Sequence, residues 1–172
     1  VAHGETPGSF LDKLARMGGI VEVLVDGKKR RSPSVQMRID PVGSVQLIST
    51  HDQILGGKDD QVFLGCTFPA RAEYRLDLHD AGYRVGAALR DQGVIGRFAI
   101  DFVSVKREGR WIHHGIEINL RKGGTTFPYL MLEFLTNGTY DRDTGTFVTP
   151  TGDTRSYYAT DNLVRRSFKG LQ

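Results

Sequence analysis

The chain has 172 residues, of which 25 % are charged and 39 % are apolar, a composition typical of a single soluble globular domain. The net charge of +3 is too small to indicate a nucleic-acid partner, although it is compatible with anionic substrates such as nucleotides. With one cysteine, no apolar run of membrane-spanning length and no signal segment, the sequence predicts a cytoplasmic protein without an intrachain disulfide.

The amino-terminal part predicts a short helix followed by a strand. Apolar residues at helical spacing favour a packing helix over Phe10 to Met17, with Ser9 as its N-cap. The apolar run Ile20 to Val25 predicts a buried strand, and Asp26-Gly27 is a hairpin signal. The basic residues 28–31 that follow are either a solvated turn or a contact for an anion.

A second hairpin is predicted by two alternating runs, Val35 to Ile39 and Val45 to Ile48. The polar stretch Ser49 to Gln53 is interpreted as a loop. Within it, Asp52 and Gln53 are suited either to contact a substrate amine or to form local hydrogen bonds in the loop.

The central part predicts one more strand and the longest helix. Gln61 to Phe68 is a strand in which Cys66 is a small buried residue rather than a nucleophile. An apolar stripe at 3.6-residue spacing predicts a helix over 71–92. Gly82 and Gly86 lie one turn apart in it, which indicates close packing of the helix backbone against the sheet.

The stretch that follows predicts a hairpin with a polar face. Two alternating runs flank residues 106–110, and a turn centred near Gly109 places Asp101 opposite Glu117 to within one residue. Glu117, Asn119 and Arg121 share one face of the return strand, and Arg97 shares the face of Asp101. Two carboxylates and an amide oxygen suit Mg²⁺, and a neighbouring arginine suits a phosphate.

A glycine pair then leads into another helix. Gly123-Gly124 permits a sharp turn, Thr125 or Thr126 can cap the helix, and Pro128 is acceptable in its first turn. The free N–H groups at such a helix start either bind an anion or belong to an ordinary capped surface helix. Beyond it, the sequence predicts a strand over 155–158 and a last short helix from Asp161.

These residues resemble a known family. Ile-Asp-Phe at 100–102 followed by Glu-Ile-Asn-Leu-Arg at 117–121 is similar to the carboxy-terminal lobe of the ATP-grasp carboxylate–amine ligases. The longer likeness is to the branch that contains the pheganomycin peptide ligase, and it covers roughly residues 18 to 165. It is carried by Gly18–Glu22, Ser32–Gln36, Ser49–Gln53, Gly65–Pro69 and Gly123–Thr126.

The resemblance implies a fold and a domain organisation. The fold would be α+β, with a mostly antiparallel sheet and helices on one face. Residues 1–172 would form a single domain, the carboxy-terminal half of an ATP-grasp fold that lacks the amino-terminal domain and most of the lid. Because the lid covers the phosphates, we expect the isolated chain to be inactive.

The resemblance also implies a reaction and its residues. The protein would be an ATP- and Mg²⁺-dependent peptide ligase, with Mn²⁺ as a possible substitute, that joins a carboxylate to an amine or peptide through an acyl phosphate. Asp101, Glu117 and Asn119 would hold the metal, and Arg121 would act on the transferring phosphoryl group. Nucleotide contacts would come from Glu22, Arg97, Arg121, Gly124 and Thr125.

One departure from the family pattern keeps a second hypothesis open. The branch usually has histidine where this chain has Phe127. The alternative is therefore a non-catalytic module that binds a nucleotide or a protein partner. In either case the expected partners are ATP and the rest of a ligase chain or a second copy, with neither nucleic acid nor a membrane.

Overall fold

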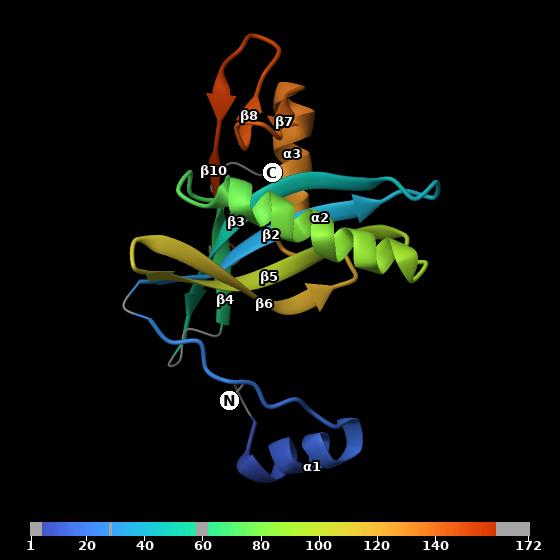
Figure 1. Cartoon of the computed structure of the whole chain (residues 1–172), viewed down its shortest axis with the longest axis vertical. Helices are drawn as coiled ribbons and strands as arrows, with labels where there is room; N and C mark the ends of the chain where they lie inside the picture. The colour runs from blue at the N-terminus through green and yellow to red at the C-terminus, as the bar shows by residue number, and fades with distance from the viewer. Residues whose placement is uncertain (1–4, 28, 58–61, 161–172) are drawn as a thin grey trace, which may run out of the picture.

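The computed structural model describes residues 5–27, 29–57 and 62–160, and within these residues the fold is α+β with two antiparallel sheets (Figure 1). The large sheet has the strand order β1-β5-β2-β3-β4-β10, with β6 paired to β5, and the small sheet has the order β7-β8-β9. This confirms the predicted fold class. The elements are α1 (Pro7–Met17), β1 (Arg30–Arg31), β2 (Pro33–Ile39), β3 (Val45–Gly56), β4 (Val62–Phe68), α2 (Arg75–Asp91), β5 (Gly96–Arg107), β6 (Arg110–Asn119), α3 (Thr126–Thr136), β7 (Thr139–Asp141), β8 (Thr146–Val148), β9 (Thr154–Arg155) and β10 (Tyr157–Thr160).

Helix α2 covers one face of the large sheet and forms the main core with it (Figure 1). Leu78 of α2 is fully buried in this core with Phe98 and Ile100 of β5. The predicted close approach is confirmed, since a Cβ atom on Gly86 would lie 2.5 Å from Val45 Cγ1. Because strand side chains alternate, β5 sends Ala99 and Asp101 to the opposite face of the sheet.

The β5–β6 hairpin turns at Glu108 and Gly109, both of which have positive φ angles (50° and 81°), as a tight two-residue turn requires. A β-bulge lies between Asp101 and Phe102. At the hairpin end, the Trp111 ring meets Tyr74 edge-on with ring centroids 4.9 Å apart. The predicted hairpin is therefore present, and the bulge sets the face on which each side chain of β6 lies.

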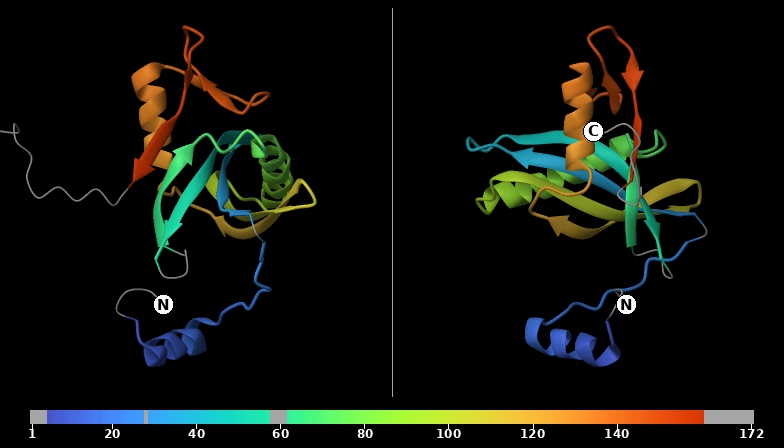
Figure 2. Two further views of the ribbon diagram at one scale, coloured as in Figure 1. Left: turned by 90° about the vertical axis from the view of Figure 1, so that its left-hand side faces the viewer. Right: turned by 180° about the vertical axis from the view of Figure 1, so that it is seen from behind.

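A second cluster joins α3 and the small sheet to the large one. Phe68, Tyr129 and Phe147 are each at most 3 % exposed and pack edge-on around one another. Figure 2 shows α3 and the β7–β8 region gathered beside β10, at the end of the sheet away from α1. This cluster holds α3 against β4 and β8. The chain enters α3 from the loop that follows β6.

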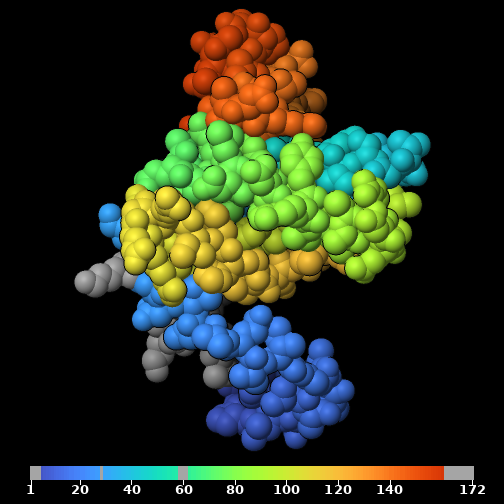
Figure 3. All heavy atoms as spheres, in the orientation of Figure 1, coloured from blue at the N-terminus to red at the C-terminus, as the bar shows by residue number. Residues whose placement is uncertain are grey.

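The amino-terminal predictions are partly wrong. Helix α1 is present, but its N-cap is Thr6, whose hydroxyl accepts from Ser9 N (3.2 Å) while Thr6 N donates to Ser9 Oγ (3.0 Å). No residue of α1 is buried, so it is not packed on the sheet. The segment 20–25 forms no strand, and Val21 is fully exposed. Figure 3 shows α1 and this segment standing out from the body as an arm.

The structure also differs from the sequence-based predictions at residues 49–53 and 155–158. Ser49 to Gln53 is not a loop but part of strand β3, in which residues 49–52 pair with β2 and residues 52–53 pair with β4. Thr50, His51 and Asp52 find hydrogen-bond partners that are distant in the chain, which local sequence patterns do not reveal. The predicted strand over 155–158 is divided between β9 and β10. Lys28, Gln61 and the helix expected from Asp161 lie outside the described residues.

None of the helices in the described ranges combines the length and the apolar character needed to cross a bilayer.

Candidate functional site

Two carboxylates meet on the face of the sheet opposite α2. Asp101 of β5 and Glu117 of β6 are direct partners in the antiparallel ladder, as the sequence predicts. The Asn119 amide donates from Nδ2 to Asp101 Oδ2 at 3.2 Å. The structure therefore brings together the three side chains that the resemblance assigns to a metal.

The carboxylate of Asp101 is held in an electrostatically unfavourable place. Burial raises its pKa above the usual value, and the negative charge of Glu117 raises it further. Hydrogen bonds from Ser34 and Gln53, together with the charge of Arg121, act in the opposite direction. A cation between the two carboxylates would offset their repulsion and favour the ionised form of Asp101.

This donor set fits Mg²⁺. It consists of two carboxylates and one amide, all of them hard oxygen ligands, and Mg²⁺ is usually held by one or two carboxylates together with substrate phosphates. In the described part of the chain, no group of three or more His, Cys, Asp and Glu side chains could hold a metal by itself. The two carboxylates and the amide of this face leave coordination positions for phosphate oxygens, which suits an ion that is bound together with a phosphate.

The arginines and the glycine pair lie around this face. Arg121 is exposed just past β6, and its Nη1 donates to Lys122 O at 3.3 Å. Arg97 is half-buried on the Asp101 face of β5. Burial raises the pKa of the Tyr129 hydroxyl of α3, and the positive charge of Arg97 acts in the opposite direction on that pKa. Both arginines therefore add positive charge to the electrostatic surroundings of Asp101 and Tyr129.

The start of α3 differs slightly from the expected cap. Thr125 occupies the N-cap position but forms no side-chain cap bond, whereas Thr126 Oγ1 accepts from Gly123 N at 3.1 Å. A Cβ atom on Gly124 would lie 3.1 Å from the Phe63 ring, so a larger residue would press on β4. Neither glycine of the pair has a positive φ angle, so the conformational freedom expected to permit a sharp turn is not used, and it is Gly124 that lets the loop lie close to the sheet.

Glu22 is the one predicted site residue that the structure does not bring to this face. It is exposed, in the segment between α1 and β1. Asp52 and Gln53 have separate roles, because adjacent residues of β3 face opposite sides. Asp52 accepts from Tyr74 Oη (2.5 Å) and from Arg71 N (3.0 Å) on the α2 side, whereas Gln53 reaches Asp101.

Sequence reasoning missed two polar residues of the site, Ser34 and Gln36 of β2. Ser34 is the direct ladder partner of Asp101, and Gln36 is the partner of Ala99. Both are buried, at 1 % and 8 % exposure. The alternation of β2 could have revealed them. Val35 and Met37 face the core, so the residues that alternate with them, Ser34, Gln36 and Arg38, share the other face.

Buried polar groups continue beneath this face. His51 is fully buried, its Nε2 lies 2.8 Å from Tyr157 Oη, and burial lowers its pKa to about 3. Burial raises the pKa of the Cys66 thiol to about 11, so this cysteine is not a reactive thiolate. These groups are neutral and structural, in agreement with the interpretation of Cys66 as a small buried residue.

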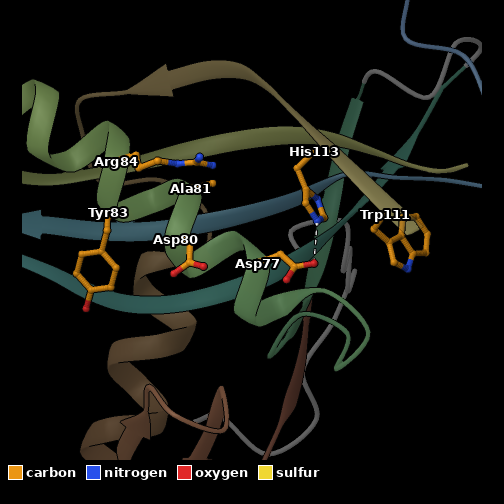
Figure 4. A pocket seen from close by; sticks show the side chains of 7 residues that line it. All are labelled: Asp77, Asp80, Ala81, Tyr83, Arg84, Trp111 and His113. Carbon is orange, nitrogen blue, oxygen red and sulfur yellow. Dashed lines mark ion pairs between the residues drawn. The ribbon is translucent and has the colours of Figure 1, made fainter. Parts of the chain in front are cut away.

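A groove of about 690 Å³ lies on the other side of the sheet, between α2 and β6 (Figure 4). Asp77 and Arg84 line it from the helix, and Trp111 and His113 line it from the strand. His113 Nε2 lies 3.7 Å from Asp77 Oδ2, and its Nδ1 lies 2.6 Å from Ser104 Oγ. None of the residues predicted for the metal or nucleotide lines this groove.

Comparison with known proteins identifies relatives. A family model described as IQCH-like, ATP-grasp matches residues 5–143. The L-propargylglycine–L-glutamate ligase of Streptantibioticus cattleyicolor is 37 % identical over 115 residues, which are 67 % of this chain and 22 % of that protein. The IQ motif-containing protein H of Danio rerio is 29 % identical over 100 residues, which are 58 % of this chain and 9 % of that protein.

Solved structures show the same fold. The biotin carboxylase–β,γ-ATP complex from Campylobacter jejuni aligns with a TM-score of 0.51 at 18 % identity, over 76 % of this chain and 28 % of that one. At this identity the likeness shows the fold alone. The chain spans about a fifth of the ligase and about a tenth of the IQ motif-containing protein.

Proposed function

The chain belongs to the IQCH-like ATP-grasp family, and from this premise we propose that it supplies the metal- and phosphate-binding lobe of an ATP-dependent carboxylate–amine ligase. Residues 1–172 would be the carboxy-terminal half of the ATP-grasp fold. The observation that carries the proposal is the pairing of Asp101 with Glu117, with Asn119 donating to Asp101. The relative named as an amino-acid ligase supports it.

In this proposal, Asp101, Glu117 and Asn119 would hold Mg²⁺ or, as a substitute, Mn²⁺. The ion would supply positive charge that neutralises phosphate oxygens of ATP. Arg121 would balance charge on the transferring phosphoryl group and Arg97 would contact the nucleotide. Gly124 and Thr125 would offer backbone N–H groups to a phosphate, and Glu22 would reach the adenosine part from the arm.

The reaction would proceed in two steps. A substrate carboxylate oxygen attacks the γ-phosphorus, the bond from γ-phosphorus to the bridging oxygen breaks, and ADP leaves with an acyl phosphate remaining. The amine nitrogen of the second substrate, an amino acid or a peptide, then attacks the acyl carbon. Phosphate leaves, the amine loses a proton, and an amide is formed. Such chemistry depends on positioning and charge neutralisation rather than on a protein nucleophile.

One observation favours a second candidate, a non-catalytic module that binds a nucleotide or a protein partner. Phe127, which replaces the histidine usual in the branch that the sequence resembles, is 71 % exposed at the start of α3. An apolar ring there cannot donate to a phosphate oxygen or transfer a proton.

The test begins with binding of ADP to the purified chain, measured by calorimetry at several Mg²⁺ concentrations. We expect Asp101→Asn and Glu117→Gln to reduce the increase in ADP affinity that Mg²⁺ causes. His113→Gln, on the other side of the sheet, should have little effect on ADP binding. Absence of Mg²⁺-dependent binding, or normal binding in both carboxylate variants, would refute the site.

A second assay separates the two candidates. The longer protein that contains this chain is incubated with ATP, candidate carboxylates and hydroxylamine, which traps an acyl phosphate as a hydroxamate. Hydroxamate formation that depends on Arg121 supports the ligase. Binding of Mg-ADP without any phosphoryl transfer supports the module.

A further inference from the structure

We propose that Ser34 and Gln36 of β2 are positioning residues that fix the Asp101 carboxylate in the orientation in which it binds a divalent cation. The inference rests on the proposed function, because it assigns a supporting role to residues beside the proposed metal ligands. Neither side chain would touch the cation or the substrate.

The ladder between β2 and β5 places both side chains beside Asp101. Ser34 is its direct partner across the ladder, and Gln36 lies opposite the small residue Ala99. With 1 % and 8 % exposure, neither side chain has free access to water. Buried polar side chains need hydrogen-bond partners, and these two find them in each other and in Asp101.

The hydrogen bonds between them have a defined direction. Gln36 Nε2 donates to Ser34 Oγ at 3.1 Å, so the serine oxygen acts as an acceptor for the glutamine. A hydroxyl has one proton to donate, and an ionised carboxylate only accepts. Ser34 is the direct cross-strand partner of Asp101 on the same face of the sheet, so its one hydroxyl proton is available to that carboxylate. The order of donation is thus Gln36 to Ser34 to Asp101.

This order limits how Asp101 can bind a cation. Asn119 donates to Asp101 Oδ2 at 3.2 Å, and Ser34 faces the same carboxylate from β2. Donors on both sides of a carboxylate restrict its rotation. Asp101 is therefore a held ligand, whereas the exposed Glu117 is the adaptable one.

The test is direct binding of Mn²⁺ to the purified chain with ADP present, measured as loss of the free-ion signal in electron paramagnetic resonance. We expect Ser34→Ala to weaken Mn²⁺ binding about tenfold, the lower end of the effect of removing a residue that orients a metal ligand. Gln36→Ala should weaken it less. The double variant should match Ser34→Ala, because Gln36 acts only through Ser34.

Ser49→Ala is the matched control. Ser49 is a fully buried serine of the neighbouring strand β3, and its Oγ has no hydrogen-bond partner in the described part of the chain. Its loss should leave Mn²⁺ binding unchanged. Thermal unfolding of each variant shows whether the fold is intact, and if Ser34→Ala does not fold, Gln36→Met, which keeps the bulk of the side chain, serves in its place.

The outcomes separate the two proposals. Normal Mn²⁺ binding in Ser34→Ala, together with weakened binding in Asp101→Asn, overturns the positioning role and leaves the metal site standing. Normal binding in both Asp101→Asn and Glu117→Gln overturns the site itself. Losses that add in the double variant would show that Gln36 acts independently of Ser34, which contradicts the relay.

Discussion

Replacement of Glu117 by Gln tests the cation site with the least disturbance to the fold. Glu117 is exposed on the open face of an edge strand, so an amide of the same shape should change the free energy of unfolding by no more than about 0.5 kcal/mol. The change removes one of the two carboxylate charges that face the proposed cation. Folding and cation binding should therefore respond very differently to it.

The size of the effect follows from Coulomb's law. A unit charge about 4 Å from a divalent ion contributes on the order of 2 kcal/mol even with the screening of bulk water, which is about thirtyfold in affinity. At a cation concentration of about a hundred times Kd, binding stabilises the wild-type chain by about 2.7 kcal/mol, whereas the variant gains about 0.9 kcal/mol. For a chain of this size, about 2–4 °C in Tm corresponds to each kcal/mol.

Thermal unfolding against Mn²⁺ concentration in the presence of ADP is the assay. The wild type should gain about 5–11 °C and Glu117→Gln about 2–4 °C at the same concentration. His113→Gln serves as the control, since that histidine faces Asp77 on the other side of the sheet. Equal gains in Glu117→Gln and wild type would show that the carboxylate pair does not bind the cation.

Three further predictions concern stability. The stability of the metal-free chain should fall as the pH rises through the folded-state pKa of Asp101, which burial and the charge of Glu117 raise, and this pH dependence should be lost in Asp101→Asn; the same pH dependence of Tm in the variant would contradict this. His51 stays neutral in the folded state because burial lowers its pKa to about 3, whereas in the unfolded chain it takes up a proton as the pH falls. The free energy of unfolding, measured with urea, should therefore fall by about 1.4 kcal/mol between pH 7.5 and 5.5. This contribution should vanish in His51→Gln. Gly86→Ala should destabilise the chain by about 1–3 kcal/mol in the same assay, because its Cβ would lie 2.5 Å from Val45 Cγ1. If the variant is instead more stable, as the higher helix propensity of alanine alone would make it, then Val45 moves to make room and the close packing does not exclude a methyl group.

Sequence patterns predicted contacts best where the residues concerned belong to the same hairpin or the same helix. A turn near Gly109 predicts the β5–β6 hairpin and the pairing of its strands to within one residue, and the β-bulge between Asp101 and Phe102 then places Asp101 opposite Glu117 rather than Ile116. The periodicity of α2 and the spacing of Gly82 and Gly86 likewise predicted which side of the helix meets the sheet. Both inferences need only the geometry of one helix or one hairpin.

Where partners are distant in the chain, the same reasoning failed. Ser49 to Gln53 resembles a loop because it is polar, yet His51 is satisfied by Tyr157 and Asp52 by Tyr74, more than twenty positions away in both cases. Ile20 to Val25 has the composition of a strand but no strand to pair with in the described part of the chain. The supporting role of Ser34 depends on β2 lying beside β5, which no local pattern specifies.

Trp111 makes the β5–β6 hairpin visible to spectroscopy. It is the single tryptophan of the chain, and its indole lies against Tyr74, donates to Glu73 Oε2 at 3.0 Å and has Lys106 Nζ 5.6 Å from its ring centroid. Selective excitation of the indole therefore reports on the strand that also carries Glu117. Emission wavelength and quenching by iodide can follow that strand during ligand titration, without an attached dye.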